Sequence, residues 1–193
     1  MDKIVFNGFV LAGGKSKRMG TDKAFLVFRE KPMLQHMLDF SMPFCKEVII
    51  SGNNSEFASF AVKVIPDQFA NCGPLGGLFA ALSHSDTDWN FITGVDTPLL
   101  ENELIYLLVS NLGNADCVVP IHQAGVEPLV AFYHRNCLPI IEESIHSGDF
   151  KLNNLLPKLK THYVDCNSLI EKYPGLFFNV NRPEDYNFIN HNK

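Results

Sequence analysis

The sequence predicts an α/β protein in which a mostly parallel β-sheet lies between two layers of helices. Short runs rich in β-branched and aromatic residues alternate with segments of helical periodicity along most of the chain. Such alternation is typical of parallel strands joined by crossover helices. The chain has 193 residues, of which 46% are hydrophobic, so it is long enough to close one substantial core. We therefore expect a single domain, residues 1–193, with a three-layer α/β/α architecture.

The first half of the chain alternates regularly between strands and helices. The expected strands are Gly8–Leu11, Glu47–Ser51, Val62–Ile65 and Trp89–Gly94, and the expected helices are Met33–Phe40, Leu75–His84 and Glu101–Leu112. Pro32 suits the first turn of the helix that follows it, because its ring fixes φ and no N–H is needed there.

The pattern changes after about Gly125, so we expect a mixed edge of the sheet there. The expected elements of the second half are strands at Cys117–Pro120, Leu129–His134 and Phe177–Val180, a helix at Leu138–Ser147, and a final helix opened by Pro183. The chain contains no internal repeat and no Gly/Ser-rich linker, so nothing in its composition marks a second domain. The second half should complete the same sheet.

Composition argues against a nucleic-acid-binding or membrane protein. The formal net charge of -5 disfavours a general surface for phosphate backbones, so any anionic ligand must be met locally. No apolar run reaches the roughly 18 residues that span a bilayer. The apolar start, Ile4–Leu11, is interrupted by Asn7 and leads into a glycine-rich loop, unlike a signal peptide.

The cysteines indicate a reducing compartment. All five are isolated in the sequence, without a Cys-x-x-Cys pair that would suggest a zinc site or a redox dithiol: Cys45, Cys72, Cys117, Cys137 and Cys166. We therefore expect a cytoplasmic protein.

A glycine-rich, basic loop follows the first expected strand. The segment Leu11–Lys23 has the sequence LAGGKSKRMGTDK, with three glycines and four cations against the single carboxylate of Asp22. Glycines let main-chain N–H groups approach a phosphate chain closely, and the cations supply charge that this acidic protein otherwise lacks. This pattern favours a loop that holds a nucleoside triphosphate. The alternative is a solvated basic turn between strand and helix.

Two known phosphate-binding loops do not fit this segment. The dinucleotide fingerprint Gly-x-Gly-x-x-Gly fails because Gly13 and Gly14 are adjacent, and the Walker spacing fails because no glycine stands five positions after either. The loop belongs to another class. In it the guanidinium of Arg18 would bind phosphate oxygens through its planar fork, and Lys23 would act as a point charge on the triphosphate.

Asp96 is the candidate magnesium ligand. It follows the expected strand Trp89–Gly94, and ligands of α/β sheets bind beyond the carboxyl ends of the strands, where the loop after the first strand also lies. Mg²⁺ commonly uses only one or two protein carboxylates beside phosphate oxygens and water. The alternative is that Asp96, in an Asp-Thr-Pro turn, simply caps a helix.

The basic loop resembles the signature L-A-G-G-x-S-x-R-M-G-x-D-K of the molybdenum cofactor guanylyltransferases, the MobA-like family of nucleotidyltransferases, and all specified positions match. Asp67 with the segment Gly73–Gly77 resembles the family's Asp and G-P-L-A-G, with Gly76 in place of alanine. Asn53 matches a nucleotide-contacting position, although it can equally belong to a plain turn.

A last stretch of similarity lies near the carboxyl terminus. The segment Phe178–Asp185 resembles F-N-V-N-T-P-E-D, with Arg182 in place of threonine. Asn179 and Asn181 would share one face of a strand and point toward the acceptor, although Asn181 can instead cap the helix after it. Glu127 lies in a stretch that resembles the family's acceptor-side wall, but neither it nor any histidine receives a role.

The resemblance implies a Rossmann-like mixed sheet of the nucleotide-diphospho-sugar transferase type. Residues 1–110 would mainly bind nucleotide and residues 111–193 mainly the acceptor. The implied reaction moves GMP from GTP to the terminal phosphate of molybdopterin, with or without bound molybdenum, and releases pyrophosphate. It implies Mg²⁺ as cofactor and transient contact with proteins of cofactor biosynthesis or molybdoenzyme maturation.

The site residues that these arguments predict fall into four roles. They are, for catalysis, Arg18, Lys23 and Asp96; for nucleotide binding, Leu11, Ala12, Gly13, Gly14, Lys23, Asn53, Asp67, Gly73, Pro74, Leu75 and Asp96; for the acceptor, Asn179 and Asn181; and for the metal, Asp96.

Two alternative functions remain open. A relative that uses CTP, or that attaches a nucleotide to a sugar or polyol phosphate, would share the loop and the metal-binding Asp, although cytidylyl relatives usually carry alanine where Gly13 stands. A nucleotide-binding regulator without catalysis would keep the fold, but the presence of both Lys23 and Asp96 argues against it.

Overall fold

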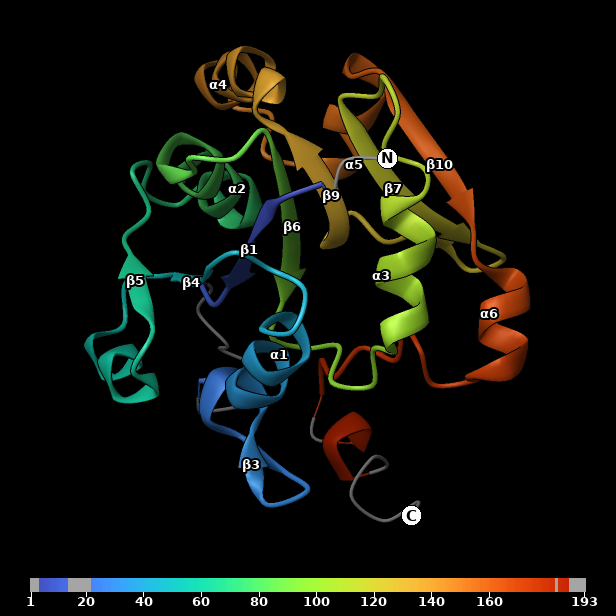
Figure 1. Cartoon of the computed structure of the whole chain (residues 1–193). Coiled ribbons are helices and arrows are strands. Elements are labelled where there is room, and N and C mark those ends of the chain that lie inside the picture. Colours follow the sequence, from blue (N-terminus) through green and yellow to red (C-terminus); the bar gives the residue numbers. More distant parts are fainter. Residues whose placement is uncertain (1–3, 14–21, 183, 188–193) are drawn as a thin grey trace.

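A computed structural model describes residues 4–13, 22–182 and 184–187. Its centre is an eight-stranded sheet with the order β10-β7-β9-β6-β1-β4-β5, in which β8 pairs with β7 (Figure 1). The pairs β10–β7, β6–β1, β1–β4 and β4–β5 are parallel, whereas β9 runs antiparallel to both of its neighbours. The prediction of a mostly parallel, mixed sheet between helices is therefore confirmed.

The first half forms the parallel part of the sheet around its central strand. The strands are β1 (Phe6–Leu11), β4 (Val48–Ser51), β5 (Lys63–Ile65) and β6 (Trp89–Gly94), joined by α1 (Met33–Ser41), η2 (Ser55–Phe60) and α2 (Gly73–His84). From β1 the chain crosses to β4 on one side, and α2 later returns it to β6 on the other side. The strand order thus reverses at β1, which is where open α/β sheets bind their ligands.

The second half completes the sheet with the predicted mixed edge. Its elements are α3 (Asn102–Val109), β7 (Cys117–His122), β8 (Gly125–Val126), β9 (Val130–His134), η3 (Arg135–Cys137), α4 (Leu138–His146), α5 (Leu152–Leu155), η4 (Leu156–Lys158), β10 (Thr161–Asp165) and α6 (Asn167–Lys172). The edge strand β10 and the helix α6 were not expected, because a single short alternating run gives little signal in the sequence. Residues 184–187 are helical, as expected after Pro183, which itself lies outside the described residues.

Two local expectations differ from the structure. A small antiparallel hairpin of β2 (Val27–Phe28) and β3 (Lys31–Pro32) precedes α1, so Pro32 lies just before the helix and not in its first turn. Its turn residues Arg29 and Glu30 adopt φ of 45° and 68°. Because this left-handed region normally calls for Gly or Asn, the sequence carried no hairpin signal.

The strand expected at Phe177–Val180 does not form. This segment is a turn followed by irregular backbone, and it joins the end of β6 through a hydrogen bond from the Val180 N–H to the Asp96 carbonyl, at 2.8 Å. The alternating apolar pattern arises because Val180 packs in a small cluster with Phe28 and Met33, not because the segment joins the sheet.

The sheet is buried on both faces. Along β1, Phe9 and Leu11 pack into one core with α2 and α4, whereas Phe6 and Val10 pack into another with α1 and α3. Successive strand residues point to opposite faces, so a strand covered on both sides is mainly apolar, and the buried Asn7 is hydrogen-bonded to Ser85, Asp86 and Thr87. Polar and charged groups that serve a ligand can then lie only at the ends of the strands.

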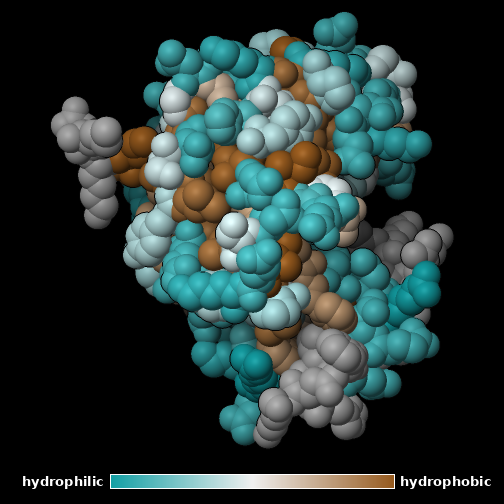
Figure 2. Space-filling model, turned by 90° about the vertical axis from the view of Figure 1, so that its right-hand side faces the viewer, coloured by the Kyte–Doolittle hydropathy of each residue, from teal (hydrophilic) through white to brown (hydrophobic). Residues whose placement is uncertain are grey.

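Figure 2 shows the face of the molecule that carries α3 and α6. Hydrophilic side chains cover most of this face, and apolar atoms emerge in a band across its middle. The exposed large apolar side chains of the chain include Val5 and Tyr106. No described helix combines the length and the apolar character needed to cross a bilayer.

Gly8 permits the close approach of the Cys45 side chain to β1. A Cβ atom at Gly8 would lie 2.6 Å from the Cys45 Sγ. We expect Gly8→Ala to lower the free energy of unfolding by about 1–3 kcal/mol through overpacking, measured by urea unfolding. The double variant Gly8→Ala/Cys45→Ala should recover most of the loss, because the clashing sulfur is gone. Simple addition of the two single-variant losses would contradict this assignment of the strain.

Candidate active site

The carboxyl ends of β1 and β6 lie side by side at the point where the strand order reverses. The register pairs Leu11 with Gly94, so the glycine-rich loop and Asp96 leave the sheet from neighbouring strands at the same edge. In Figure 1 this edge faces α1 and the β2–β3 hairpin, while α4 lies at the opposite end. The expected meeting of the two segments is therefore present in the fold.

Three polar side chains from distant parts of the chain meet at this edge. The Lys23 Nζ lies 3.3 Å from the Asp96 Oδ2 and donates a hydrogen bond of 2.7 Å to the Asn181 Oδ1. The Lys23 and Asp96 side chains are 16% and 22% exposed, so this ion pair is partly shielded from water but still accessible. Lys23 is therefore positioned between a carboxylate and an amide oxygen, where it can turn toward an arriving phosphate.

Lys23 is held in place by the short helix η1 (Lys23–Phe25). Asp22 caps this helix, because its Oδ1 accepts the N–H of Ala24 at 3.1 Å. The other oxygen of Asp22 accepts a hydrogen bond from the Asn54 Nδ2, also at 3.1 Å, which ties the end of the loop to the segment after β4. Ala24 is fully buried and anchors the turn.

Part of the basic loop lies outside the described residues. This holds for Gly14 and Arg18, both predicted to contact phosphate, and for Lys15 and Lys17. Their predicted roles stay predictions.

Asp96 is not a helix cap. The helix α3 begins at Asn102, with Glu101 in its N-cap position, so the alternative that Asp96 caps the following helix is wrong. Gly94 leaves room for its carboxylate, because a Cβ there would lie 2.9 Å from the Asp96 Oδ1. The carboxylate is therefore turned back over the end of β6, toward Lys23.

A second group of predicted residues meets beside Gly13. The Asp67 Oδ2 lies 3.1 Å from the position that a Cβ on Gly13 would occupy. The Asp67 backbone is fixed by its N–H, which donates to the Asn53 Oδ1 at 3.1 Å, and its Oδ1 accepts from the Ser51 hydroxyl at 3.4 Å. Asn53 thus fixes the Asp67 backbone, and its neighbour Asn54 caps η2. The predicted nucleotide contact of Asn53 stays a prediction.

Three of the remaining residues predicted to contact the nucleotide can do so only through their main-chain atoms. Leu75 is fully buried, and Leu11 and Ala12 are 7% and 6% exposed, so their side chains belong to the core. Gly73 opens α2 with a φ of 56°, which favours glycine, and Pro74 is exposed beside it. The amino end of α2 is therefore exposed at Gly73 and Pro74, next to the buried Leu75.

The two predicted acceptor residues reach the site by a different route from the one expected. The argument that Asn179 and Asn181 share one face of a strand is wrong, because that strand does not exist. Both residues are exposed, and Asn181 contacts Lys23. The Asp185 Oδ2 accepts the N–H groups of Asn181 and Arg182, each at 2.9 Å, and so holds this turn.

Sequence reasoning missed a polar cluster at the same edge of the sheet. The His122 Nε2 lies 3.0 Å from the Glu127 Oε1, and the His122 ring stacks on Phe177. His122 ends β7, and Glu127 follows β8 on the way to β9. Phe177 lies fifty residues after Glu127 in the sequence. No spacing in the sequence signals such a contact.

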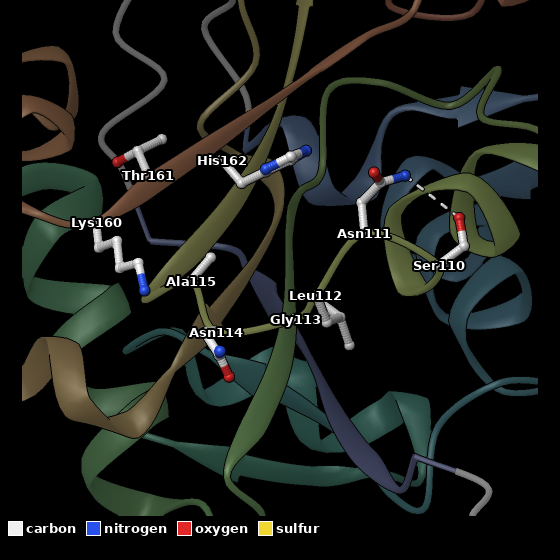
Figure 3. Close-up of a pocket in the computed structure, with 9 residues that line it drawn as sticks. All are labelled: Ser110, Asn111, Leu112, Gly113, Asn114, Ala115, Lys160, Thr161 and His162. Carbon is white, nitrogen blue, oxygen red and sulfur yellow. Dashed lines mark hydrogen bonds between the residues drawn. The ribbon is translucent and has the colours of Figure 1, made fainter. Parts of the chain in front are cut away.

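A pocket lies at the opposite edge of the sheet. Its cavity of about 410 Å³ is bounded by the α3–β7 connection, with Ser110 and Asn114, and by Lys160 and His162 at the start of β10 (Figure 3). These residues lie at the amino ends of β7 and β10, away from Asp96. None of the predicted site residues lines it.

Within the described residues, no group of three or more His, Cys, Asp or Glu side chains could hold a metal ion. A protein-only metal cage is therefore absent from this part of the chain. A metal held mainly by phosphate oxygens and water needs only one or two carboxylates, and Asp96 provides one at the right edge.

Burial raises the pKa of the Asp67 carboxyl above its ordinary value of 3.8, and the Ser51 hydrogen bond lowers it only in part. Between the ordinary and the raised pKa the folded state keeps a proton that the unfolded state has lost, so stability falls as pH rises through this window. We expect Asp67→Asn to be more stable relative to the parent chain at pH 7 than at pH 3. Urea unfolding at both values measures this, and an equal difference at the two values would contradict it.

Comparison with known proteins assigns the chain to a family. The profile described as MobA-like NTP transferase domain matches residues 8–162. Two proteins named probable molybdenum cofactor guanylyltransferase are similar to it. That of Flavobacterium johnsoniae is 32% identical, covering 95% of this chain and 96% of that protein. That of Pyrococcus furiosus is 37% identical, covering 92% of this chain and 93% of that protein.

A solved structure is similar as well. The crystal structure of molybdopterin-guanine dinucleotide biosynthesis protein A from Archaeoglobus fulgidus matches with a TM-score of 0.82 and 25% identity, covering 96% of this chain and 97% of that one. The chain therefore belongs to the MobA-like NTP transferase family of nucleotidyltransferases.

Proposed function

We propose that this protein transfers a guanylyl group from GTP to the terminal phosphate of molybdopterin and releases pyrophosphate. The observation that carries the proposal is the convergence of Lys23, Asp96 and Asn181 beside the glycine-rich loop. The names of the similar proteins supply the substrates: GTP as donor and molybdopterin, with or without molybdenum, as acceptor. The product would be a guanine dinucleotide form of the cofactor.

The chemistry needs alignment and charge neutralisation more than proton transfer. An oxygen of the acceptor phosphate, already ionised at neutral pH, attacks the α-phosphorus of GTP. A new P–O bond forms, the bond between the α-phosphorus and its bridging oxygen breaks, and pyrophosphate leaves with the electron pair. No strong general base is required, so the enzyme acts mainly by holding the two phosphates in line.

Lys23 and Arg18 would neutralise the charge that grows on the leaving pyrophosphate. Lys23 is supported in this role by its position, because its ammonium lies at the carboxyl edge of the sheet in a partly accessible ion pair with Asp96. Arg18 lies outside the described residues and is included because its guanidinium can bind two phosphate oxygens at once.

Mg²⁺ fits this arrangement, with Asp96 as its protein ligand. The Asp96 carboxylate is accessible, lies at the carboxyl edge of the sheet and faces a lysine that a triphosphate would draw away. When bound, the metal would neutralise phosphate oxygens and help to align them. The amide oxygen of Asn181, which accepts from Lys23, would be available to hydrogen-bond water bound to this metal.

The two substrates would occupy the two halves of the chain. Residues 1–110 supply Gly13, Asn53 and Asp67, beside the amino end of α2, for the nucleotide. Residues 111–193 supply Asn179 and Asn181 for the acceptor. The centre of the reaction then lies between them, at Lys23 and Asp96.

We also place the protein in the cytoplasm, where it would contact cofactor-biosynthesis or molybdoenzyme-maturation proteins transiently. The five cysteines are free, as expected in a reducing compartment. Burial raises the pKa of the Cys45 thiol to about 12, so this partly accessible thiol stays protonated and unreactive.

A relative that uses CTP is the second candidate, because it would share the loop and the metal-binding Asp. Gly13 disfavours it, because cytidylyl relatives usually carry alanine at this position. An alanine here would bring its Cβ to 3.1 Å from the Asp67 Oδ2. We expect pyrophosphate release with molybdopterin as acceptor to be faster with GTP than with CTP at equal concentrations. Initial rates with the two nucleotides measure this, and a preference for CTP would favour the second candidate. Binding of GTP without pyrophosphate release would instead indicate a non-catalytic regulator.

Asp96→Asn keeps the size of the side chain but removes its charge. We expect pyrophosphate release to fall by roughly 100-fold or more, because the carboxylate that would hold the metal is lost. The thermal midpoint should change little. Asp149→Asn serves as the control, since Asp149 pairs with Lys158 at 3.4 Å outside the site. Normal turnover of Asp96→Asn at limiting Mg²⁺ would rule out the metal assignment.

A further inference from the structure

The His122–Glu127 pair lies at the acceptor side of the carboxyl edge. β9 runs antiparallel to β6 with Thr93 opposite Val130, and the Gly94 N–H donates to the Leu129 carbonyl at 3.0 Å. Asp96 lies two residues after Gly94, and Glu127 lies two residues before Leu129. Both carboxylates therefore leave the sheet at the same edge, from neighbouring strands.

The hydrogen bonds of the pair fix the histidine tautomer. The Ala124 N–H points at the His122 Nδ1 at 3.2 Å, and a backbone N–H can only donate, so Nδ1 is an acceptor. The neutral ring then carries its proton on Nε2 and donates it to the Glu127 Oε1 at 3.0 Å. The Glu127 backbone is fixed as well, since its N–H donates to the Pro120 carbonyl at 3.0 Å. His122 is thus a positioning residue with both nitrogens engaged, and Glu127 is the group that it orients.

Phe177 connects this pair to the predicted acceptor residues. Its ring stacks on His122 with centroids 5.2 Å apart and planes 6° from parallel. Two residues further along the chain is Asn179, followed by Asn181, whose amide oxygen accepts from Lys23. The stack therefore ties His122, and through its hydrogen bond Glu127, to the segment that would hold the acceptor phosphate.

The charge of Glu127 determines what it can bind. Its side chain is 23% exposed, and no Lys or Arg in the described part of the chain forms an ion pair with it; its one close partner there is the neutral His122. A carboxylate in this setting repels phosphate and binds N–H donors. Its Oε1 already accepts from His122, but the remaining lone pairs can accept further hydrogen bonds.

The pterin ring of molybdopterin offers a matching set of donors. Its 2-amino-4-oxopyrimidine edge carries an exocyclic amino group and a ring N–H that point in the same direction. A carboxylate can accept from both at once, and such charge-assisted pairs are the stronger class of hydrogen bond. The guanine of GTP carries the same edge, but Gly13, Asn53 and Asp67 lie on the other side of the site, next to β4 and α2.

We propose that Glu127, oriented by the neutral His122, recognises the 2-amino-4-oxopyrimidine edge of the pterin acceptor. This inference rests on the proposed function and names a specificity residue for it. The acceptor is then bound at two points of opposite character: its phosphate by the amides of Asn179 and Asn181, beside Lys23, and its pterin by a carboxylate.

The decisive variant is Glu127→Gln, which keeps the shape but replaces one acceptor oxygen by an NH₂ donor. We expect the KM for molybdopterin to rise roughly tenfold or more, because a charged hydrogen bond is lost, while the KM for GTP stays unchanged. Glu142→Gln is the matched control, since Glu142 also faces a histidine, His146, at 3.9 Å but on the outer helix α4.

Two simple pteridines test the recognised edge directly. A 2-amino-4-oxopteridine should inhibit the wild-type reaction more strongly than 2,4-dioxopteridine, which has a carbonyl in place of the amino group. Glu127→Gln should remove this preference. His122→Ala should weaken it, and His122→Gln, which keeps an N–H donor, should restore part of it without a matching change in thermal midpoint.

The outcomes are distinguishable from failure of the proposed function. Absence of pyrophosphate release by the wild-type protein with GTP and molybdopterin would refute the proposed function, and binding of the two pteridines would still test Glu127. A raised KM for GTP would instead assign Glu127 to guanine, and a raised Mg²⁺ requirement would assign it to the metal. Either result, or unchanged constants for both substrates, overturns the proposal.

Discussion

The site depends on one interaction, the contact of the Lys23 ammonium with Asp96 and Asn181. These three residues come from the end of the glycine-rich loop, the end of β6 and the segment that replaces a final strand. Their meeting requires that β1 and β6 be parallel neighbours and that the strand order reverse between them. Asp22 and Asn54 add a link to β4, so the loop end is tied to three of the segments around the crevice. A displacement of any one of them would separate the cation from its partners.

Burial of the sheet explains why the chemistry is confined to this edge. Phe9 and Val10 fill opposite cores, so the middle of β1 has no room for a polar side chain. The polar groups therefore gather where the strands end. Asp67 illustrates the cost, because partial burial beside Gly13 raises its pKa and makes its ionised form less favourable. Such a cost is typical of residues held for binding and not for stability.

Much of the fold followed from hydrophobic periodicity, and the failures have physical causes. The sequence predicts Trp89–Gly94 with its observed bounds, because Trp, Phe, Ile and Thr favour strands and the run is short and ends in glycine. The β2–β3 hairpin was missed because Arg29 and Glu30 occupy a backbone region that favours glycine. Phe177–Val180 has the apolar composition of a strand, but Phe177 packs into one core whereas Phe178 and Val180 pack into a separate small cluster. Local pattern does not distinguish these cases from a strand.

The site shows the same division between local and tertiary information. The meeting of Lys23 and Asp96 could be predicted, because Lys23 ends the loop that follows β1 and Asp96 follows β6. The carboxyl ends of neighbouring parallel strands lie at the same edge of a sheet. The His122–Glu127–Phe177 cluster was not, because it depends on the antiparallel turn around β8 and on a stack across the sheet edge.

The charge pattern of the site gives its two ends different tasks. In a protein of net charge -5, a cation at the crevice is the exception, and Lys23 is paired with Asp96 before a triphosphate binds. At the other end a neutral histidine leaves the charge of Glu127 uncompensated. An acceptor with an anionic phosphate at one end and N–H donors at the other can therefore bind in only one direction. The reverse orientation would set the acceptor phosphate against the Glu127 carboxylate, so the same electrostatics that bind the acceptor also align its phosphate for attack.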